Sequence, residues 1–147
     1  MFVPAVLQQN ESAELESFLV FVFGDKPQNL ARNYKTCQFS DDYCRPTFIV
    51  IKDGTNIIGA VAYSEEFFTV NVWGLSWVAV HPDYRRHGIG RQLIDYCGNQ
   101  IQAIAEADFT VLLNAYPDIS DLYRQTGFAD LGIDHGGGLF MRKIIRL

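Results

Sequence analysis

The sequence predicts a single domain of the mixed α/β (α+β) class over residues 1–147, and three observations support this class. The length of 147 residues suits one domain and leaves little room for a second. Hydrophobic residues make up 48% of the chain and aromatic residues 14%, as expected of a domain with a well-packed core. The apolar pattern alternates between strand and helix periods in the order β-α-α-β-β-β-α-β-α-β-β, which predicts helices packed on a sheet.

The N-terminal residues are predicted to form a short strand and a helix. The strand covers 1–7, and Pro4 favours an edge position because proline has no backbone N–H to donate. The helix covers 10–23, with Asn10 or Ser12 as its N-cap and glutamates in its first turn.

The pattern then changes from helical to extended. A weaker helical pattern covers 26–39, and the polar loop at 40–46 could lie near the mouth of a substrate site. Two β-rich runs follow over 46–52 and 56–64. Asp53-Gly54 between them is a strong hairpin-turn signal.

A third β-rich run, residues 67–80, is long enough for one continuous, bent strand. Gly74 in its middle predicts a bulge or a close approach by another backbone. We expect Trp73 and Trp77 to lie on one side of this strand and to pack in the core. The helix that follows packs one apolar face on the sheet. That face consists of Ile89, Leu93, Cys97, Ile101 and Ile104.

The C-terminal part is predicted to add three strands and a short helix. The first strand covers 109–116, and the helix covers 117–127 with Gly127 as the residue that ends it. The last two strands, 128–133 and 138–147, surround a glycine-rich turn.

Charge and cysteine content limit the classes of partner. The net charge of −5 argues against general nucleic-acid or membrane-surface affinity, which needs a basic field. It would suit a cationic substrate, although the same charge also serves solubility alone. No signal peptide is evident, and the apolar stretch 18–23 is too short to span a bilayer.

The three cysteines show no metal-binding spacing, so we expect no metal site. Reduced thiols in a cytoplasmic protein are the simple interpretation of Cys37, Cys44 and Cys97. A disulfide between Cys37 and Cys44 is the alternative.

The stretch from His81 to Leu93 has the composition of an anion-binding turn between a strand and a helix. Exposed N–H groups at a helix start can point at phosphate oxygens, and the helix dipole adds about half a positive charge there. Gly88 and Gly90 permit unusual φ angles and remove side chains that would block a ligand. The arginines that can add charge-assisted bonds are Arg85, Arg86 and Arg91.

Two common phosphate-binding loops do not fit this stretch. A Walker loop requires Lys-Ser or Lys-Thr after its last glycine, where this chain has Arg91-Gln92. A dinucleotide-binding loop requires a third glycine where Leu93 stands, and it lies in a βαβ unit that the preceding hairpin does not supply.

The segment "VAVHPDYRRHGIGRQLI" resembles the acyl-CoA-binding motif of the Gcn5-related N-acetyltransferase (GNAT) family, whose core is Arg/Gln-x-x-Gly-x-Gly/Ala. Arg85, Gly88 and Gly90 occupy those positions. Downstream, "DLYRQTGF" at 121–128 resembles the family's late "LY-x-x-x-GF" element. The order and spacing of the two elements also agree with the family.

The resemblance implies a fold and a cosubstrate. The fold is a central, twisted, mostly antiparallel sheet of six to seven strands that splays at its middle, flanked by about four helices. The cosubstrate is acetyl-CoA, with its pyrophosphate on main-chain amides and its pantetheine arm on a strand backbone. The residues implied in binding it are Val78, Val80, Arg85, Arg86, His87, Gly88, Ile89, Gly90, Arg91, Asn114 and Tyr123. Asn114 stands two positions before the family's usual asparagine position, which Tyr116 occupies here.

The resemblance also implies an N-acetyltransferase, in which a primary amine of a small molecule or peptide attacks the thioester directly. Tyr123 matches the family tyrosine that serves as general acid. The general base stays open, because the strand that often carries it offers only Ser76. The remaining candidates, acting directly or through water, are Glu65, Glu66, Asp41 and Asp42.

A non-catalytic acyl-CoA-binding or protein-interaction module with the same fold is the alternative function. A homodimer formed through the late strands is an open alternative to a monomer.

Overall fold

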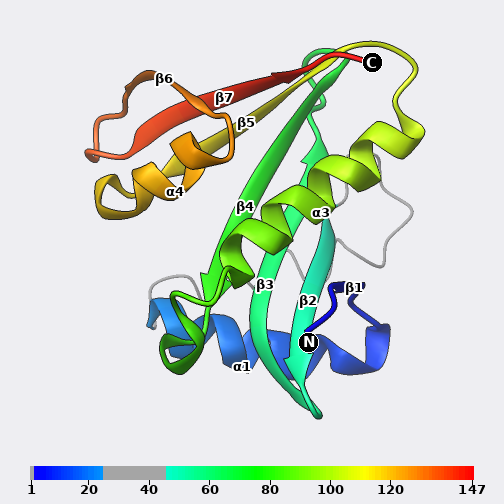
Figure 1. Cartoon of the computed structure of the whole chain (residues 1–147), viewed down its shortest axis with the longest axis vertical. Helices are drawn as coiled ribbons and strands as arrows, with labels where there is room; N and C mark the ends of the chain where they lie inside the picture. The colour runs from blue at the N-terminus through cyan, green and yellow to red at the C-terminus, as the bar shows by residue number, and fades with distance from the viewer. Residues whose placement is uncertain (1, 25–45) are drawn as a thin grey trace.

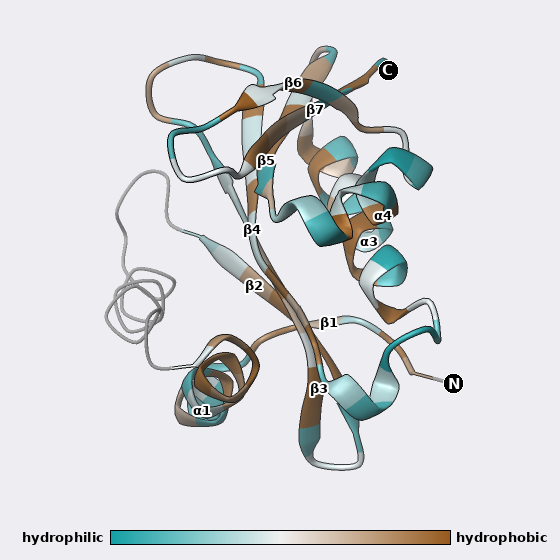
Figure 2. Cartoon of the chain, turned by 90° about the vertical axis from the view of Figure 1, so that its left-hand side faces the viewer, coloured by the Kyte–Doolittle hydropathy of each residue, from teal (hydrophilic) through white to brown (hydrophobic). Residues whose placement is uncertain are grey.

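The computed structural model describes residues 2–24 and 46–147, which form one sheet with helices on both faces (Figures 1 and 2). The helix predicted over 26–39 and nearly all of the loop at 40–46 lie outside the described residues, as do Cys37, Cys44, Asp41 and Asp42. Within the described ranges, each helix is either too short or too polar to cross a lipid bilayer.

The described elements agree with the predicted order. The strands are β1 (Ala5–Val6), β2 (Thr47–Asp53), β3 (Asn56–Glu65), β4 (Val72–Val80), β5 (Phe109–Ala115), β6 (Ala129–Ile133) and β7 (Leu139–Ile145). The α-helices are α1 (Ser12–Phe23), α3 (Ile89–Ile104) and α4 (Ser120–Gln125). Short 3-10 turns precede them at η1 (Gln9–Glu11), η2 (Pro82–Tyr84) and η3 (Pro117–Ile119).

The sheet has seven strands in the order β1-β2-β3-β4-β5-β7-β6. All neighbouring pairs are antiparallel except β4 and β5, which run parallel. β1 lies at one edge, as Pro4 predicts, since an edge strand can spare a donor. The predicted mixed α/β fold with a mostly antiparallel sheet is therefore confirmed.

The sheet splays between β4 and β5. These strands pair only where Val72–Gly74 face Thr110–Leu112, and beyond this point they diverge (Figure 1). From Leu75 to Val80, no described strand pairs with β4 on its β5 side. The predicted opening in the middle of the sheet is thus present.

β4 is shorter than the predicted strand over 67–80. Residues 67–71 form a turn, which the N–H of Glu66 closes by donating to the carbonyl of Val72 at 2.9 Å. Asn71 has a φ of 59° in this turn, a left-handed conformation that asparagine tolerates better than other side chains. The hydrophobicity of Phe67, Phe68 and Val70 suggested a strand, yet all three side chains are exposed.

Gly74 has neither the predicted bulge nor a close approach by another backbone, because its close neighbour is the Glu66 side chain; the bulge lies at Trp77. Ala60 pairs with Ala79 and Ala62 with Ser76, so two residues of β4 face one residue of β3. Trp77 has a φ of 55° at this position. Because the extra residue reverses the alternation of the strand, Trp77 packs on the α1 side while Trp73 packs on the α3 side, contrary to the prediction that they share one side.

Two hydrophobic clusters cover the two faces of the sheet. The larger cluster lies under α3 and α4 and contains Leu93, Ile101 and Met141, all fully buried. The smaller cluster lies under α1 (Figure 2). The predicted apolar face of α3 is buried except for Ile104, the last helical residue, which is 63% exposed.

The start of α1 differs from the prediction, whereas the end of α4 agrees with it. The N-cap of α1 is Glu11, so neither Asn10 nor Ser12 caps it. The η1 turn displaces the start, and its capping bond runs from the N–H of Gln8 to Glu11 Oε1 at 2.8 Å. At the other end of the chain, Gly127 follows α4 with a φ of 98°, the predicted left-handed terminator.

Candidate active site

A cavity of about 760 Å³ lies where β4 and β5 part. Leu75, Val78 and Leu113 line it and belong to the cluster on the α3 side, whereas Trp77 and Phe23 pack with the cluster on the α1 side. The cavity is therefore lined from both faces of the sheet. The other lining residues are Ser76, Asn114, Tyr116, Pro117, Ile119, Tyr123, Asp134, Gly136, Gly137 and Gly138.

The start of α3 presents a row of unbonded N–H groups. The first N–H to bond along the helix is that of Gln92, which donates to the carbonyl of Gly88 at 2.9 Å. In residues 2–24 and 46–147, no group accepts a hydrogen bond from the N–H groups of residues 86 to 91. Unbonded amides and the positive end of a helix dipole can together bind an anion.

The two glycines of the motif serve different purposes. Gly88 caps α3 in the left-handed conformation, with a φ of 76°, and a Cβ built there would meet no atom within 4 Å. Gly90 faces inward, where a Cβ would lie 3.2 Å from Leu122 Cδ2 and 3.7 Å from Val80 Cγ2. Gly88 thus leaves the amides open to a ligand, whereas Gly90 lets α3 pack against α4 and β4.

Several side chains of the motif stabilise the loop itself. Arg85 Nε donates to the carbonyl of Val80 at 3.3 Å. His87 Nδ1 lies 2.8 Å from the carbonyl of Arg85, and Arg91 faces Asp95 at 3.8 Å. Arg86 has no side-chain hydrogen bond or ion pair within the described part of the chain. Arg86 is therefore the arginine of this motif that can turn to a bound anion without breaking a contact.

Tyr123 extends from α4 into the lining of the cavity. Its side chain is 3% exposed and packs edge-to-face on Phe128, with ring centroids 6.0 Å apart. Burial raises the pKa of Tyr123 to about 12. The phenol is consequently neutral near pH 7 and can donate a hydrogen bond.

The candidate bases Glu65 and Glu66 do not line the cavity. Glu65 ends β3 and pairs with Trp73. Glu66 folds back over β4, because a Cβ built on Gly74 would lie 2.6 Å from its Oε1 atom. Gly74 is the last residue of β4 that pairs with β5. The carboxylate of Glu66 therefore lies over the point where the strands part.

Asn114 does line the cavity, but its amide is bonded to another side chain. Asn114 Nδ2 donates to Asp134 Oδ2 at 2.6 Å. Asp134 is a residue of the cavity lining that the sequence motifs do not predict. The signal present is an aspartate two residues before glycine, whose side chain can accept backbone N–H groups of the turn.

The sequence profile of the acetyltransferase (GNAT) domain matches residues 45–130, a range that includes both motifs. The resemblance inferred from the motifs is therefore confirmed. None of the curated proteins matches this chain.

Solved structures share the fold over nearly the whole chain. The GNAT-family N-acetyltransferase YhbS from Escherichia coli, in complex with CoA, is 21% identical with a TM-score of 0.75 over 97% of this chain and 81% of that one. PaiA N-acetyltransferase from Thermoplasma acidophilum, also with coenzyme A, is 14% identical with a TM-score of 0.74 over 99% of each chain. An aminoglycoside 6′-N-acetyltransferase complexed with coenzyme A is 12% identical with a TM-score of 0.79 over 97% and 96%.

Proposed function

Because the chain belongs to the GNAT family of acetyltransferases, we propose that it transfers the acetyl group of acetyl-CoA to a primary amine of a small molecule or peptide. The observation that carries this proposal is the row of unbonded N–H groups from Arg86 to Arg91, at the end of a strand that lines a cavity. An amide row of this kind suits a diphosphate, and three structures of the same fold hold CoA.

The residues present fit acetyl-CoA, which supplies an activated acetyl thioester when bound. The amides of residues 86 to 91 would hold the diphosphate, with Arg86 free to turn to it. The edge of β4 at Val78 and Val80, which has no strand partner among the described residues, would pair with the peptide-like groups of the pantetheine arm, as an added strand does, although the Val80 carbonyl already accepts from Arg85. The thioester end would then lie in the cavity near Tyr123.

The reaction forms a C–N bond, breaks the C–S bond, and moves one proton from the amine to the sulfur. We assign Tyr123 as the hydrogen-bond and proton donor to the departing sulfur. A phenol with a pKa of about 12 is a weaker acid than a thiol with a pKa of about 8.5, so donation to a free thiolate is unfavourable. The donation must therefore coincide with C–S cleavage, and the phenol must regain a proton that derives from the amine.

We assign Glu66 in preference to Glu65 as the general base, acting through water. Its carboxylate lies over Gly74, next to the cavity-lining Leu75, whereas Glu65 is the last residue of β3 and pairs with Trp73, which does not line the cavity. Asp41 and Asp42, the other candidates, lie outside the described residues. A cytoplasmic location belongs to the same proposal, and the buried, free thiol of Cys97 is consistent with a reducing compartment.

A matched pair of variants at Gly88 tests the anion site. Asn and Asp both tolerate the left-handed conformation, have nearly the same shape, and would occupy open space. Gly88→Asp adds a negative charge among the amides, so we expect its affinity for CoA to fall at least about tenfold below that of Gly88→Asn, by charge repulsion. Titration calorimetry with CoA measures this difference.

The unmodified protein provides the reference. Acetyl-CoA at 100 times its dissociation constant should add about 2.7 kcal/mol to the free energy of unfolding, which a thermal-shift assay detects. Equal CoA affinity in the two Gly88 variants would show that the diphosphate lies elsewhere. CoA binding without release of CoA thiol across a panel of amines would contradict the transferase and favour a non-catalytic acyl-CoA-binding module.

A further inference from the structure

Asp134 is the one residue with a charged side chain among the described residues that line the cavity. Its carboxylate is held in place by three hydrogen bonds. Asp134 Oδ1 accepts from the N–H groups of Gly136 and Gly138 at 2.7 and 2.8 Å, and Oδ2 accepts from Asn114 Nδ2 at 2.6 Å. These bonds fix a negative charge in a lining that has no other charged side chain, and a carboxylate fixed in this way can bind a cationic group of a ligand.

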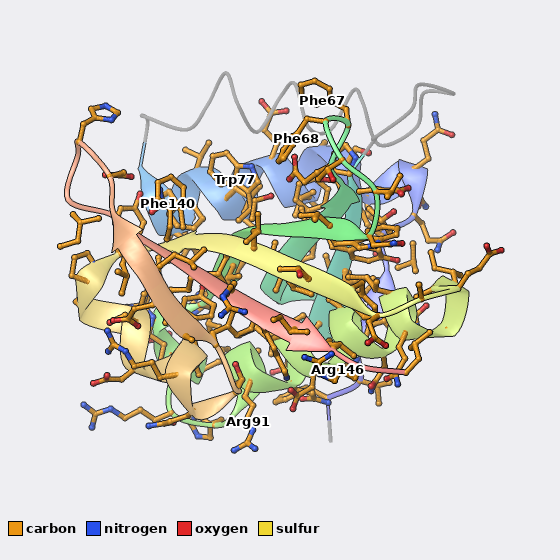
Figure 3. The ribbon with its side chains drawn as sticks, turned by 90° about the horizontal axis from the view of Figure 1, so that it is seen from above. Phe67, Phe68, Trp77, Arg91, Phe140 and Arg146 are labelled. Carbon is orange, nitrogen blue, oxygen red and sulfur yellow. The ribbon has the colours of Figure 1, made fainter. Side chains whose placement is uncertain are left out.

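The position of Asn114 shows which end of the cavity Asp134 occupies. Asn114 follows Leu113 on β5, and Leu113 packs in the cluster on the α3 side, so Asn114 faces the α1 side. Phe140 pairs with Asn114 and shares this face. Figure 3 shows Trp77 and Phe140 on the side of the sheet that carries α1, with Arg91 on the opposite side.

The two ends of the cavity therefore differ in character. The end on the α3 side leads along β4 to the unbonded amides that suit the diphosphate of the acetyl donor. The end on the α1 side combines the aromatic rings of Trp77 and Phe23, whose centroids are 5.4 Å apart, with the carboxylate of Asp134. This second end is left for the acceptor.

The hydrogen bonds of Asp134 argue for a binding role and against a role as base. The bond from Asn114, followed by that from the N–H of Gly138, lowers the pKa of Asp134, which makes it a poor proton acceptor. A carboxylate paired with the reacting amine would also keep that amine protonated, and a protonated amine cannot attack a thioester. An ionised, fixed carboxylate is therefore best suited to a positive group that does not react.

We propose that Asp134 binds a second, non-reacting ammonium group of the acceptor, so that the preferred acceptors are diamines and longer polyamines with a terminal primary amine. This inference rests on the proposed acetyl transfer. The second ammonium binds at Asp134, and the alkyl chain lies along the aromatic rings of Trp77 and Phe23. The other amino group then reaches the thioester uncharged. The net charge of −5 attracts polycations to the molecule as a whole.

Matched acceptor pairs test this assignment. Each diaminoalkane from 1,3-diaminopropane to 1,6-diaminohexane is compared with the amino alcohol of the same length, which replaces one ammonium by a hydroxyl group. At the best length, we expect the KM of the diamine to be at least about tenfold lower, because a hydrogen bond to a charged group is stronger than a neutral one. The kcat values of the pair should be similar.

Asp134→Asn should remove this preference. The side-chain carbonyl oxygen of the introduced asparagine can still accept from the N–H groups of Gly136 and Gly138, so we expect the turn to be retained. The KM of the diamine should rise to that of the amino alcohol, with kcat changed by less than about threefold. Asp118→Asn removes the same charge from an exposed residue that does not line the cavity, and it should leave the preference unchanged.

A double variant addresses the case in which Asp134→Asn disturbs the turn. N114D/D134N keeps a hydrogen bond between the two side chains and returns the charge to the cavity, so the preference for diamines should recover. A double variant no better than Asp134→Asn would show that turn geometry and not charge sets the preference. That result would overturn the inference.

The outcomes separate this inference from the proposed function. Absence of acetyl-CoA binding would refute acetyl transfer, and calorimetric titration of the unliganded protein with the diamines would then still test Asp134. If acetyl-CoA binds and CoA thiol is released, but no diamine is preferred over its amino alcohol, the acetyltransferase stands and the role of Asp134 is wrong. If Asp134→Asn still prefers the diamine over its amino alcohol, the role of Asp134 is likewise wrong.

Discussion

Tyr123 contributes one functional atom to the cavity, because all other atoms of its ring pack in the core. Tyr123→Phe keeps the edge-to-face contact with Phe128 and removes only the hydroxyl group, to which no described residue hydrogen-bonds. We expect kcat to fall about 100-fold or more through the loss of a proton donor, with CoA affinity and melting temperature nearly unchanged. Single-turnover kinetics at saturating amine measure the chemical step. An unchanged rate would assign Tyr123 to packing alone.

Glu66 and Glu65 form a natural pair for testing the base. Glu66→Gln should lower kcat/KM about 100-fold near pH 7, where the amine substrate is mostly protonated. The deficit should shrink above the pKa of the amine, because the neutral nucleophile then forms without a base. Glu65→Gln should stay within about threefold of the unmodified protein throughout. A pH-rate profile for both variants tests this, and a Glu66→Gln deficit that is constant with pH would contradict the assignment.

At the scale of elements, the position of α3 depends on a close contact with β3. A Cβ built on Gly59 would lie 2.8 Å from Ile89 Cγ2 and 3.1 Å from Leu93 Cδ1. Ile89 is the first residue of α3, so any displacement here moves the unbonded amides. The glycine therefore sets the distance between the sheet and the anion site.

Gly59→Ala should act on both stability and ligand binding. We expect the free energy of unfolding to fall by about 1–3 kcal/mol through overpacking, and the affinity for CoA to fall with it. Gly132→Ala is the matched control, because a Cβ there meets no atom within 4 Å and the expected change is within about 0.5 kcal/mol. Urea unfolding and CoA titration provide the two measurements. Normal CoA affinity in Gly59→Ala would show that α3 adjusts without moving its amides.

The elements also show where sequence reasoning succeeds and where it ends. The row of unbonded N–H groups at the start of α3 was predictable because these groups belong to consecutive residues, so Gly88 and its neighbours specify it locally. The bulge was misplaced because Gly74 has the conformational freedom that a bulge needs, whereas Trp77 does not. The carboxylate of Glu66 lies against Gly74, and that contact depends on the turn at 67–71. The sequence predicts a strand there because the turn contains apolar residues, which the structure shows to be exposed.

At the scale of the whole molecule, the sequence did not predict contacts between segments that are distant in the chain. Asn114 and Asp134 meet because β7 lies between β5 and β6 in the sheet, an order that no local pattern in either segment encodes. The element order, the mixed class and the splayed sheet were predicted, the last through the family resemblance. The end of the cavity on the α1 side, to which we assign the acceptor, depends on strand order and on the reversal at Trp77 and was not predicted.

The three residue pairs between β4 and β5 are the only strand pairing that links the two parts of the described sheet, β1 to β4 and β5 to β7. Such a short seam should open at a lower free energy than the ladders on either side, and its amide protons should exchange sooner. A cosubstrate bonded to the edge of β4 would raise the free energy needed to separate β4 from β5. Amide exchange at this pairing should therefore slow when the cosubstrate binds and return to its initial rate when the product dissociates.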